Sequence, residues 1–181
     1  MTPERAALLA ELLKEVRADR GFWPTEQTFL LSTEVAAQAA LEIVIFGEGG
    51  RTVFLSQYEK PWFGEKGLWH LPGGYAKPLQ DKDFGAMAGR IFSREIGVPL
   101  QLKGILGEPY WWIPGEHDNT GSRPVSLYAV CEPLAPISET ETHRFFLGND
   151  PPSPLIGGSH KNFFERYDAY QVMALAQGLL D

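Results

Sequence analysis

The chain has 181 residues, of which 44% are hydrophobic and 22% are charged, and its formal net charge is −7. These values are typical of a soluble globular protein, and one domain with terminal additions accounts for the length. The acidic balance argues against a protein that binds nucleic acid non-specifically, because such a protein needs a basic surface.

Several further classes are excluded by what the sequence lacks. Cys131 is the only cysteine, so neither a disulfide within the chain nor a cysteine zinc site can form. No apolar run approaches the roughly 18 residues of a membrane-spanning helix. No signal peptide precedes the first predicted helix. We therefore expect a cytoplasmic protein that has neither a membrane nor a nucleic acid as its partner.

The N-terminal segment is predicted to form a helix and a lead-in over 1–38, followed by the main domain over 39–181. Thr2-Pro3-Glu4 has the residue types of a helix start. A leucine-rich stripe follows at helical spacing. We interpret this helix as packed on the domain, and a contact in a homodimer is the alternative.

The next two apolar segments are predicted to form a hairpin. Residues 39–46 favour a buried strand, 47–50 a glycine-rich turn, and 52–58 a returning strand. Glu42 is the acidic exception in the first strand. It is either a carboxylate that faces water at a strand end or a carboxylate that lines a functional site.

The most informative stretch is a glycine turn followed by a helix. Pro72 fixes its own φ, and Gly73 and Gly74 leave backbone groups bare enough to approach a phosphate or a metal ion. A helix is predicted after Asp83, which is a good N-cap residue, and before Gly97, which suits the position after a helix end.

The side chains of this helix form two adjoining stripes. Met87, Ile91 and Glu95 share one stripe, because residues four apart lie on the same face of a helix. Arg90 and Arg94 share the next stripe. The last turns of the helix therefore carry one carboxylate and two guanidinium groups.

The remainder of the chain is predicted to complete a sheet and close it with a helix. Residues 102–112 and 125–131 favour strands on either side of a polar loop at 114–124. An acidic stretch over 138–146 leads into a short strand. Helical spacing of apolar residues over 162–179 predicts the closing helix.

The turn and the helix resemble the Nudix box, whose pattern is Gly-x5-Glu-x7-Arg-Glu-U-x-Glu-Glu-x-Gly-U, with U an aliphatic residue. In this chain, Lys82, Ile91 and Arg94 stand at three of the four acidic positions of the pattern. The loop before the helix is two residues longer than in the pattern. The resemblance implies an α/β fold, namely a Nudix-like α/β/α sandwich with a mixed sheet, to which the predicted N-terminal helix is added. The residues that match the pattern are Gly74, Arg90, Phe92, Glu95, Gly97 and Val98.

The loss of acidic residues is similar to that in one Nudix branch, the GDP-mannose mannosyl hydrolases. The helix of that branch reads Arg-Leu-Thr-x-Ala-Glu-Leu-Gly, and residues 90–97 are similar to it position by position. Glu42 stands where the branch has an aspartate. Asp118-Asn119 resembles its Asp-Asn loop, and Tyr128 lies in a strand similar to its tyrosine-bearing strand.

This resemblance implies a Mg²⁺-dependent hydrolase of a nucleoside diphosphate sugar that releases the sugar and the nucleoside diphosphate. Glu95 and the Gly73 carbonyl would hold the Mg²⁺, and Arg90 would orient Glu95 or contact phosphate. The general base of the branch is not reproduced here, and the aligned stretch offers Glu139, Glu141 and His143 as candidates. We expect Glu139 or Glu141 to be the base, with Glu139 favoured by alignment. The residues expected to bind the substrate are Glu42, Lys60 and Tyr128.

Two other functions stay open at this point. One is a Nudix pyrophosphohydrolase with a shifted metal set that uses Glu139 or Glu141. The other is a non-catalytic module that binds a nucleotide. Such a role would explain why Ile91 and Arg94 stand at acidic positions of the pattern. Analysis of reaction products separates the first two, because cleavage at the sugar and cleavage between the phosphates release different molecules.

Overall fold

The computed structural model describes residues 2–4, 7–8, 11, 39–58, 67–77, 80–111 and 125–180. Of the predicted N-terminal helix, residues 3–4, 7–8 and 11 are described, and they are helical. The boundary at residue 38 and the possible dimer contact lie outside the described residues and stay predictions.

Four strands form a mixed sheet in the order β5-β1-β7-β6. β1 (Ala39–Val44) runs parallel to β7 (Val125–Pro133) and antiparallel to β5 (Gly73–Tyr75), and β6 (Leu100–Trp111) pairs antiparallel with β7. Parallel neighbours need a long connection, so β5, the helix after it and β6 lie between β1 and β7 along the chain. The mixed sheet is therefore confirmed.

A second, antiparallel sheet is built on β3 (Thr52–Gln57). β2 (Phe46–Gly47) and β4 (Trp69–His70) pair with successive parts of one edge of β3, and β8 (His143–Leu147) pairs with the other edge. A 3-10 turn, η1 (Glu48–Gly50), joins β2 to β3 and confirms the predicted hairpin.

The sequence predicts one strand over 39–46, but the structure divides this segment at Ile45. β1 pairs in the mixed sheet, whereas β2 pairs in the antiparallel sheet. The Ile45 carbonyl still accepts a hydrogen bond from the Phe54 N–H at 3.0 Å. The chain therefore passes from one sheet to the other without leaving a backbone carbonyl unpaired at Ile45.

The helix α3 (Phe84–Glu95) packs on one side of the strands. The Asp83 side chain accepts a hydrogen bond from the Ala86 N–H at 2.8 Å, and Gly97 follows with a φ of +79°, so both predicted helix ends are confirmed. The buried apolar cluster between α3 and the strands contains Leu41, Ile43, Phe54, Met87, Ala88, Ile91 and Phe92.

The sequence predicts a single closing helix over 162–179, whereas the structure has two, α4 (Ser159–Glu165) and α5 (Tyr167–Ala176). The interruption falls at Arg166, where φ is −114° and ψ is 17°. Side chains on either side of the interruption point into the core. Phe163 and Tyr170 stack there, with ring centroids 5.5 Å apart.

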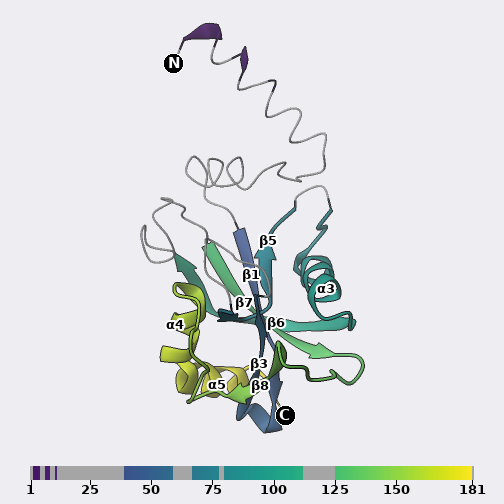
Figure 1. Ribbon diagram of the computed structural model, residues 1–181, viewed down its shortest axis with the longest axis vertical. Helices are drawn as coiled ribbons and strands as arrows, with labels where there is room; N and C mark the ends of the chain where they lie inside the picture. The colour runs from purple at the N-terminus through teal and green to yellow at the C-terminus, as the bar shows by residue number, and fades with distance from the viewer. Residues whose placement is uncertain are drawn as a thin grey trace.

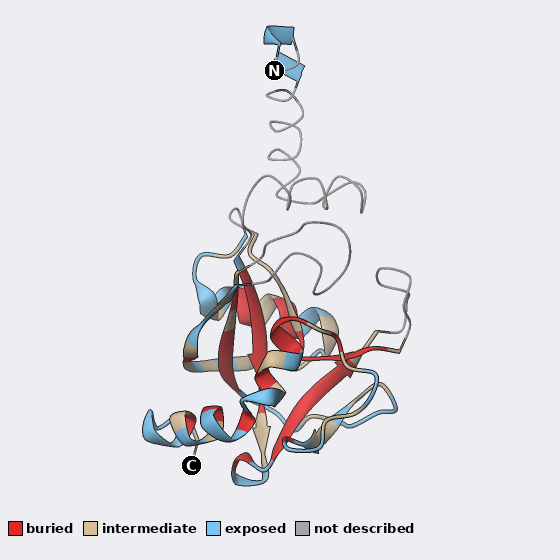
Figure 2. Cartoon of the chain, turned by 90° about the vertical axis from the view of Figure 1, so that its left-hand side faces the viewer, coloured by how far each residue is buried: buried red, intermediate tan, exposed pale blue. Residues whose placement is uncertain are grey.

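The elements form three layers. Figure 1 shows α3 on one side of the strands and α4 and α5 on the other. Figure 2 shows that the buried residues are concentrated in the strands between them. The predicted α/β/α sandwich is thus confirmed. Among the described residues, no helix has the length and apolar character to cross a membrane.

Ile91 tests the packing of α3, because it is fully buried in the cluster under this helix. Ile91→Ala should lower the free energy of unfolding by about 2–5 kcal/mol, because it removes buried methyl groups and leaves a cavity. Urea unfolding measures the change. Val172→Ala is the matched control, because Val172 is 65% exposed. A loss within about 0.5 kcal/mol, as for surface substitutions, would contradict the burial of Ile91.

Candidate functional site

The site is organised around the turn that leads into β5. The Ile43 N–H donates a hydrogen bond to the Pro72 carbonyl at 2.7 Å, which fixes the turn beside β1. The next residue, Gly73, lies directly opposite Glu42. A Cβ at Gly73 would overlap Glu42 Oε2 and come within 3.0 Å of the Leu41 carbonyl oxygen. Only glycine therefore lets the Glu42 carboxylate lie against this turn.

Glu42 does not face water, because only 4% of its surface is exposed. The hydroxyl groups of Ser126 and Ser159 donate hydrogen bonds to Glu42 Oε1 at 3.0 and 2.9 Å. His160 Nε2 lies 3.8 Å from Glu42 Oε2. These partners come from β7 and α4, and they offset the loss of hydration that burial imposes on a carboxylate.

The hydrogen bonds of Leu71 assign the tautomers of two buried histidines. The Leu71 N–H donates to His160 Nδ1 at 3.2 Å, so the proton of neutral His160 is on Nε2, the atom nearest Glu42. The Leu71 carbonyl accepts from His70 Nδ1 at 2.8 Å. Burial lowers the pKa of His70 to about 3, so this ring stays neutral. Tyr58 stacks on it, with centroids 4.0 Å apart.

Glu95 ends α3 next to the same turn. Its Oε1 accepts a hydrogen bond from Arg94 Nη2 at 2.7 Å, and its Oε2 is buried without a hydrogen-bond donor among the described residues. Burial raises the pKa of Glu95 to about 7, the charge of Arg94 acts in the opposite direction, and the charge of Glu42 adds to the rise. Both protonation states of this carboxyl group are therefore populated near neutral pH.

Arg94 joins the end of the helix to the turn. The Nη2 atom that contacts Glu95 is also 3.4 Å from the Gly73 carbonyl oxygen. The Arg94 side chain is 57% exposed. The two groups that the sequence analysis assigns to Mg²⁺ do lie together, but a guanidinium nitrogen already contacts both.

The donor set around Arg94 does not fit a resident Mg²⁺ ion. Mg²⁺ takes six oxygen ligands in near-octahedral geometry, and water or substrate phosphate supplies several of them. Within the part of the chain that the structure describes, no three His, Cys, Asp or Glu side chains come together as a metal-ligand set. The Gly73 carbonyl and the Glu95 carboxylate, meanwhile, already face the positive charge of Arg94.

Arg90 contacts the loop before α3. Its Nε and Nη2 donate to the two carboxylate oxygens of Asp81 at 2.6 Å each, and Nη2 also donates to the Tyr75 carbonyl at 3.0 Å. Burial pushes the pKa of Asp81 up, but the Arg90 hydrogen bonds outweigh this and hold it below its ordinary value. Arg90 thus connects α3, its preceding loop and β5.

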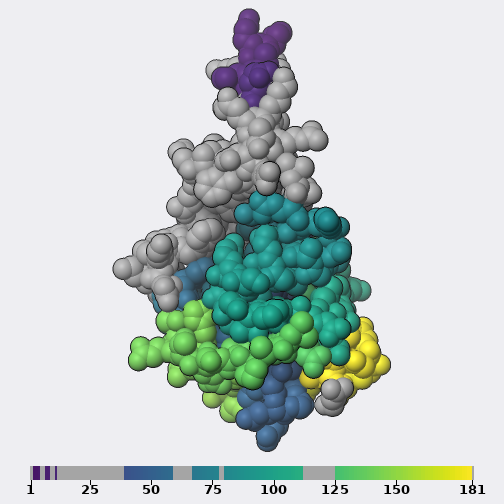
Figure 3. Space-filling model, turned by 90° about the vertical axis from the view of Figure 1, so that its right-hand side faces the viewer, coloured from purple at the N-terminus to yellow at the C-terminus, as the bar shows by residue number. Residues whose placement is uncertain are grey.

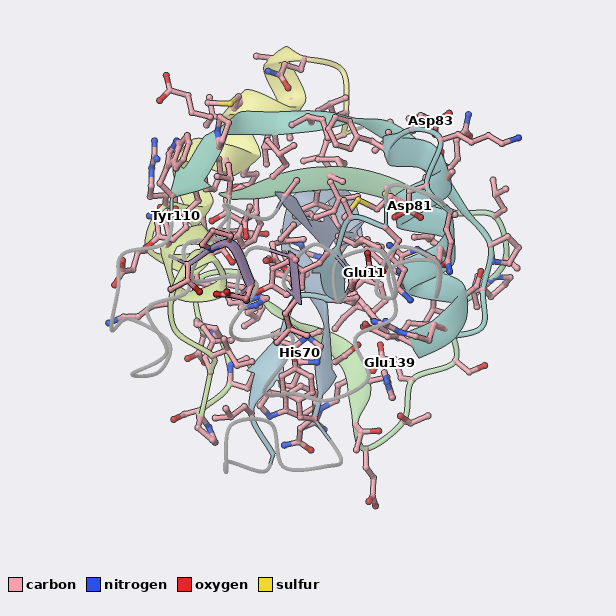
Figure 4. All side chains as sticks on the ribbon, turned by 90° about the horizontal axis from the view of Figure 1, so that it is seen from above. Glu11, His70, Asp81, Asp83, Tyr110 and Glu139 are labelled. Atoms are coloured by element: carbon pink, nitrogen blue, oxygen red, sulfur yellow. The ribbon has the colours of Figure 1, made fainter. Side chains whose placement is uncertain are left out.

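Of the remaining predicted site residues, Tyr128 lies beside Glu42, its register partner across β1 and β7. Tyr128 is fully buried, and its hydroxyl donates to the Ser159 carbonyl at 2.6 Å, which holds the start of α4. Glu139 is exposed between β7 and β8. Figure 3 shows this part of the chain in green beside the teal surface of α3, and Figure 4 shows Glu139 well apart from Asp81. Lys60 and the 114–124 loop lie outside the described residues.

Sequence reasoning misses several residues of the site. Ser126 lies two residues before Tyr128 on the same face of β7, so strand alternation is a signal that could have found it. His160 belongs to a segment with only a loose counterpart in the resembled branch. Asp81 stands in a polar loop and carries no signal for its pairing with Arg90.

The raised pKa of Glu95 predicts a pH-dependent stability. Because its pKa is about 7 in the folded chain and 4.5 ordinarily, the folded state binds this proton more tightly. The resulting stabilisation is complete below about pH 4.5 and is lost as the pH rises through about 7. Glu95→Gln should therefore gain stability relative to the wild type over this range, by on the order of 3 kcal/mol.

Urea unfolding at about pH 4.5, 6 and 8 measures this difference. Glu141→Gln is the control, because Glu141 is exposed and its variant should follow the wild type at each pH. A constant difference between Glu95→Gln and the wild type would contradict the raised pKa.

Known proteins resemble this chain in structure rather than in sequence. No family model and no curated protein matches it. An ADP-ribose pyrophosphatase from Streptococcus suis 89-1591 superposes with a TM-score of 0.53 at 22% identity, over 76% of this chain and 91% of that chain. A MutT Nudix hydrolase from Burkholderia pseudomallei superposes with a TM-score of 0.54 at 20% identity, over 72% of this chain and 97% of that chain. A UDP-X diphosphatase superposes with a TM-score of 0.54 at 15% identity, over 97% of this chain and 82% of that chain. The chain therefore has the fold of the Nudix hydrolases.

Proposed function

We propose that the chain is a cytoplasmic hydrolase of a nucleoside diphosphate sugar and releases the sugar and the nucleoside diphosphate. One observation carries this proposal. At the end of α3, a carboxyl group with a pKa of about 7, that of Glu95, contacts the guanidinium of Arg94 beside the glycine turn. Two of the structural neighbours are named for nucleoside diphosphate compounds, ADP-ribose and UDP-X.

Arg94 is the group that we assign to the diphosphate. A guanidinium matches phosphate oxygens with two parallel hydrogen bonds. Its contacts with Glu95 and Gly73 use Nη2, so other N–H groups of this largely exposed side chain can reach a ligand. A positive charge at the leaving diphosphate stabilises the negative charge that develops there as the bond to the sugar breaks.

Glu95 is the group that we assign to proton transfer. A pKa of about 7 keeps both protonation states populated at neutral pH, as a general acid or base requires. Because Glu95 contacts the guanidinium that we place on the diphosphate, its protonated form would give a proton to the leaving oxygen. Water would attack the anomeric carbon from the opposite face, where Glu139 or Glu141 remains the proposed base.

Cleavage between the phosphates is the second candidate, and the names of the neighbouring ADP-ribose pyrophosphatase and UDP-X diphosphatase favour it. The resembled pattern uses several carboxylates for that reaction, whereas only Glu95 remains at the four acidic positions. Attack at the anomeric carbon needs fewer catalytic carboxylates, because a diphosphate is a good leaving group once a cation neutralises its negative charge. We therefore place cleavage at the sugar first.

A screen of nucleoside diphosphate sugars and ADP-ribose, with products separated by chromatography, tests the proposal. Release of free sugar and nucleoside diphosphate supports it. Release of a sugar phosphate and a nucleoside monophosphate would establish the second candidate instead. Binding without any product would identify a non-catalytic nucleotide-binding module. Each substrate is assayed both with Mg²⁺ and with a chelator.

The proposed acid role of Glu95 predicts a particular pH profile. The turnover number of the wild type should fall as the pH rises above about 7, because the protonated form of Glu95 is lost. Glu95→Gln should lower turnover by at least about 10²-fold, the scale for loss of one transition-state stabiliser. Glu132→Gln, an exposed residue on β7, is the control and should match the wild type.

Two outcomes would contradict this assignment. Turnover that rises with pH through about 7 and loses that limb in Glu95→Gln would make Glu95 a base rather than an acid. Wild-type turnover in Glu95→Gln would remove the residue from the reaction altogether.

A further inference from the structure

The position of Arg94 has a consequence that does not depend on the proposed reaction. Its Nη2 atom lies 2.7 Å from Glu95 Oε1 and 3.4 Å from the Gly73 carbonyl oxygen. A carboxylate and a backbone carbonyl are the oxygen donors that a divalent ion such as Mg²⁺ or Mn²⁺ prefers. The guanidinium therefore contacts both of the donors that such an ion would use.

The surroundings of Arg94 favour a cation at this position. Glu42 is buried against Gly73, where a Cβ would overlap its Oε2, and the Glu95 side chain is 17% exposed. Two carboxylates that are largely removed from water repel each other when both are ionised. The pKa of the nearby Tyr58 hydroxyl is raised by burial and then by the charges of Glu95 and Glu42, as a local excess of negative charge requires.

We propose that Arg94 is the built-in cation of this site and excludes a divalent ion from the position between Glu95 and Gly73. The guanidinium keeps its charge at every physiological pH and is attached to the helix that carries Glu95. A free ion must displace it and overcome its repulsion. Removal of the guanidinium leaves the two donors facing an empty position, with room for water to complete the coordination of an ion.

The exclusion does not require a strong ion pair. The Arg94 side chain is 57% exposed, and ion pairs at this exposure add little to folding stability. What matters is that one positive charge lies close to the place where a second would bind. At a separation of about 4 Å, that repulsion weakens the binding of a divalent ion by about tenfold or more, even in bulk water.

Mn²⁺ is a suitable probe, because it prefers the same oxygen ligands as Mg²⁺ and its free form is measured directly by electron paramagnetic resonance. Arg94→Ala should bind Mn²⁺ at least about tenfold more tightly than the wild type. The double variant Arg94→Ala with Glu95→Gln should lose this gain, because it removes the chief ligand. Arg94→Lys keeps a positive charge and should stay near the wild type.

Arg51→Ala is the matched control. Arg51 forms a similar ion pair with Glu48 at 3.0 Å, on the 3-10 turn η1, and its side chain is 72% exposed. Removal of this arginine takes away the same charge from an ordinary surface pair. Its Mn²⁺ affinity should equal that of the wild type. Urea unfolding of each variant establishes that the chains compared are folded.

Equal Mn²⁺ affinity in the wild type and Arg94→Ala would overturn the proposal, and so would a gain that persists after Glu95→Gln. A gain in Arg51→Ala equal to that in Arg94→Ala would also overturn it, because the effect would then reflect net charge alone. The binding measurement involves no substrate. A wild-type chain that hydrolyses no nucleotide sugar therefore leaves this inference standing, and the two proposals fail separately.

Discussion

The site depends on the close approach of the Gly73 backbone to the Glu42 side chain. These residues face each other across β5 and β1, at a distance that leaves no room for a Cβ on Gly73. The carboxylate of Glu42 can therefore lie against the turn, where Ser126 and Ser159 meet it from β7 and α4. The same turn presents the Gly73 carbonyl to Arg94. Because Gly73 has no side chain, the Glu42 carboxylate, the serines of β7 and α4, and the Arg94 guanidinium can all lie close to this turn.

The turn is also held from its far side, by residues distant in the sequence. The Leu71 N–H donates to His160 on α4, and Tyr128 holds the carbonyl of the preceding Ser159. The carboxylate of Glu42 is the common partner of these segments, since Ser159 also donates to it. A buried carboxylate is destabilising by itself, but here it fixes how α4 meets the strands. The hydrogen bonds to Glu42 therefore belong both to the polar site and to the packing of α4 on the strands.

Local signals account for the features that the sequence predicts well. Asp83 and Gly97 set the ends of α3 through their own backbone preferences, and these do not depend on distant residues. The pairing of Asp81 with Arg90 is different, because it arises only when the loop folds back on the helix. Apolar spacing alone likewise does not reveal the break at Arg166, on either side of which Phe163 and Tyr170 stack in the core.

The two departures from the acidic pattern on α3 differ in their effect on Glu95. Ile91 adds its side chain to the core, so it contributes no charge to the site, while Arg94 contributes a positive one. A carboxylate bound to a divalent ion stays ionised at neutral pH, because the ion favours its charged form. The single charge of a half-exposed guanidinium does not outweigh burial, and the pKa of Glu95 rises to about 7. Exchange of a metal ion for an arginine would therefore turn a permanent ligand into a group that can gain and lose a proton.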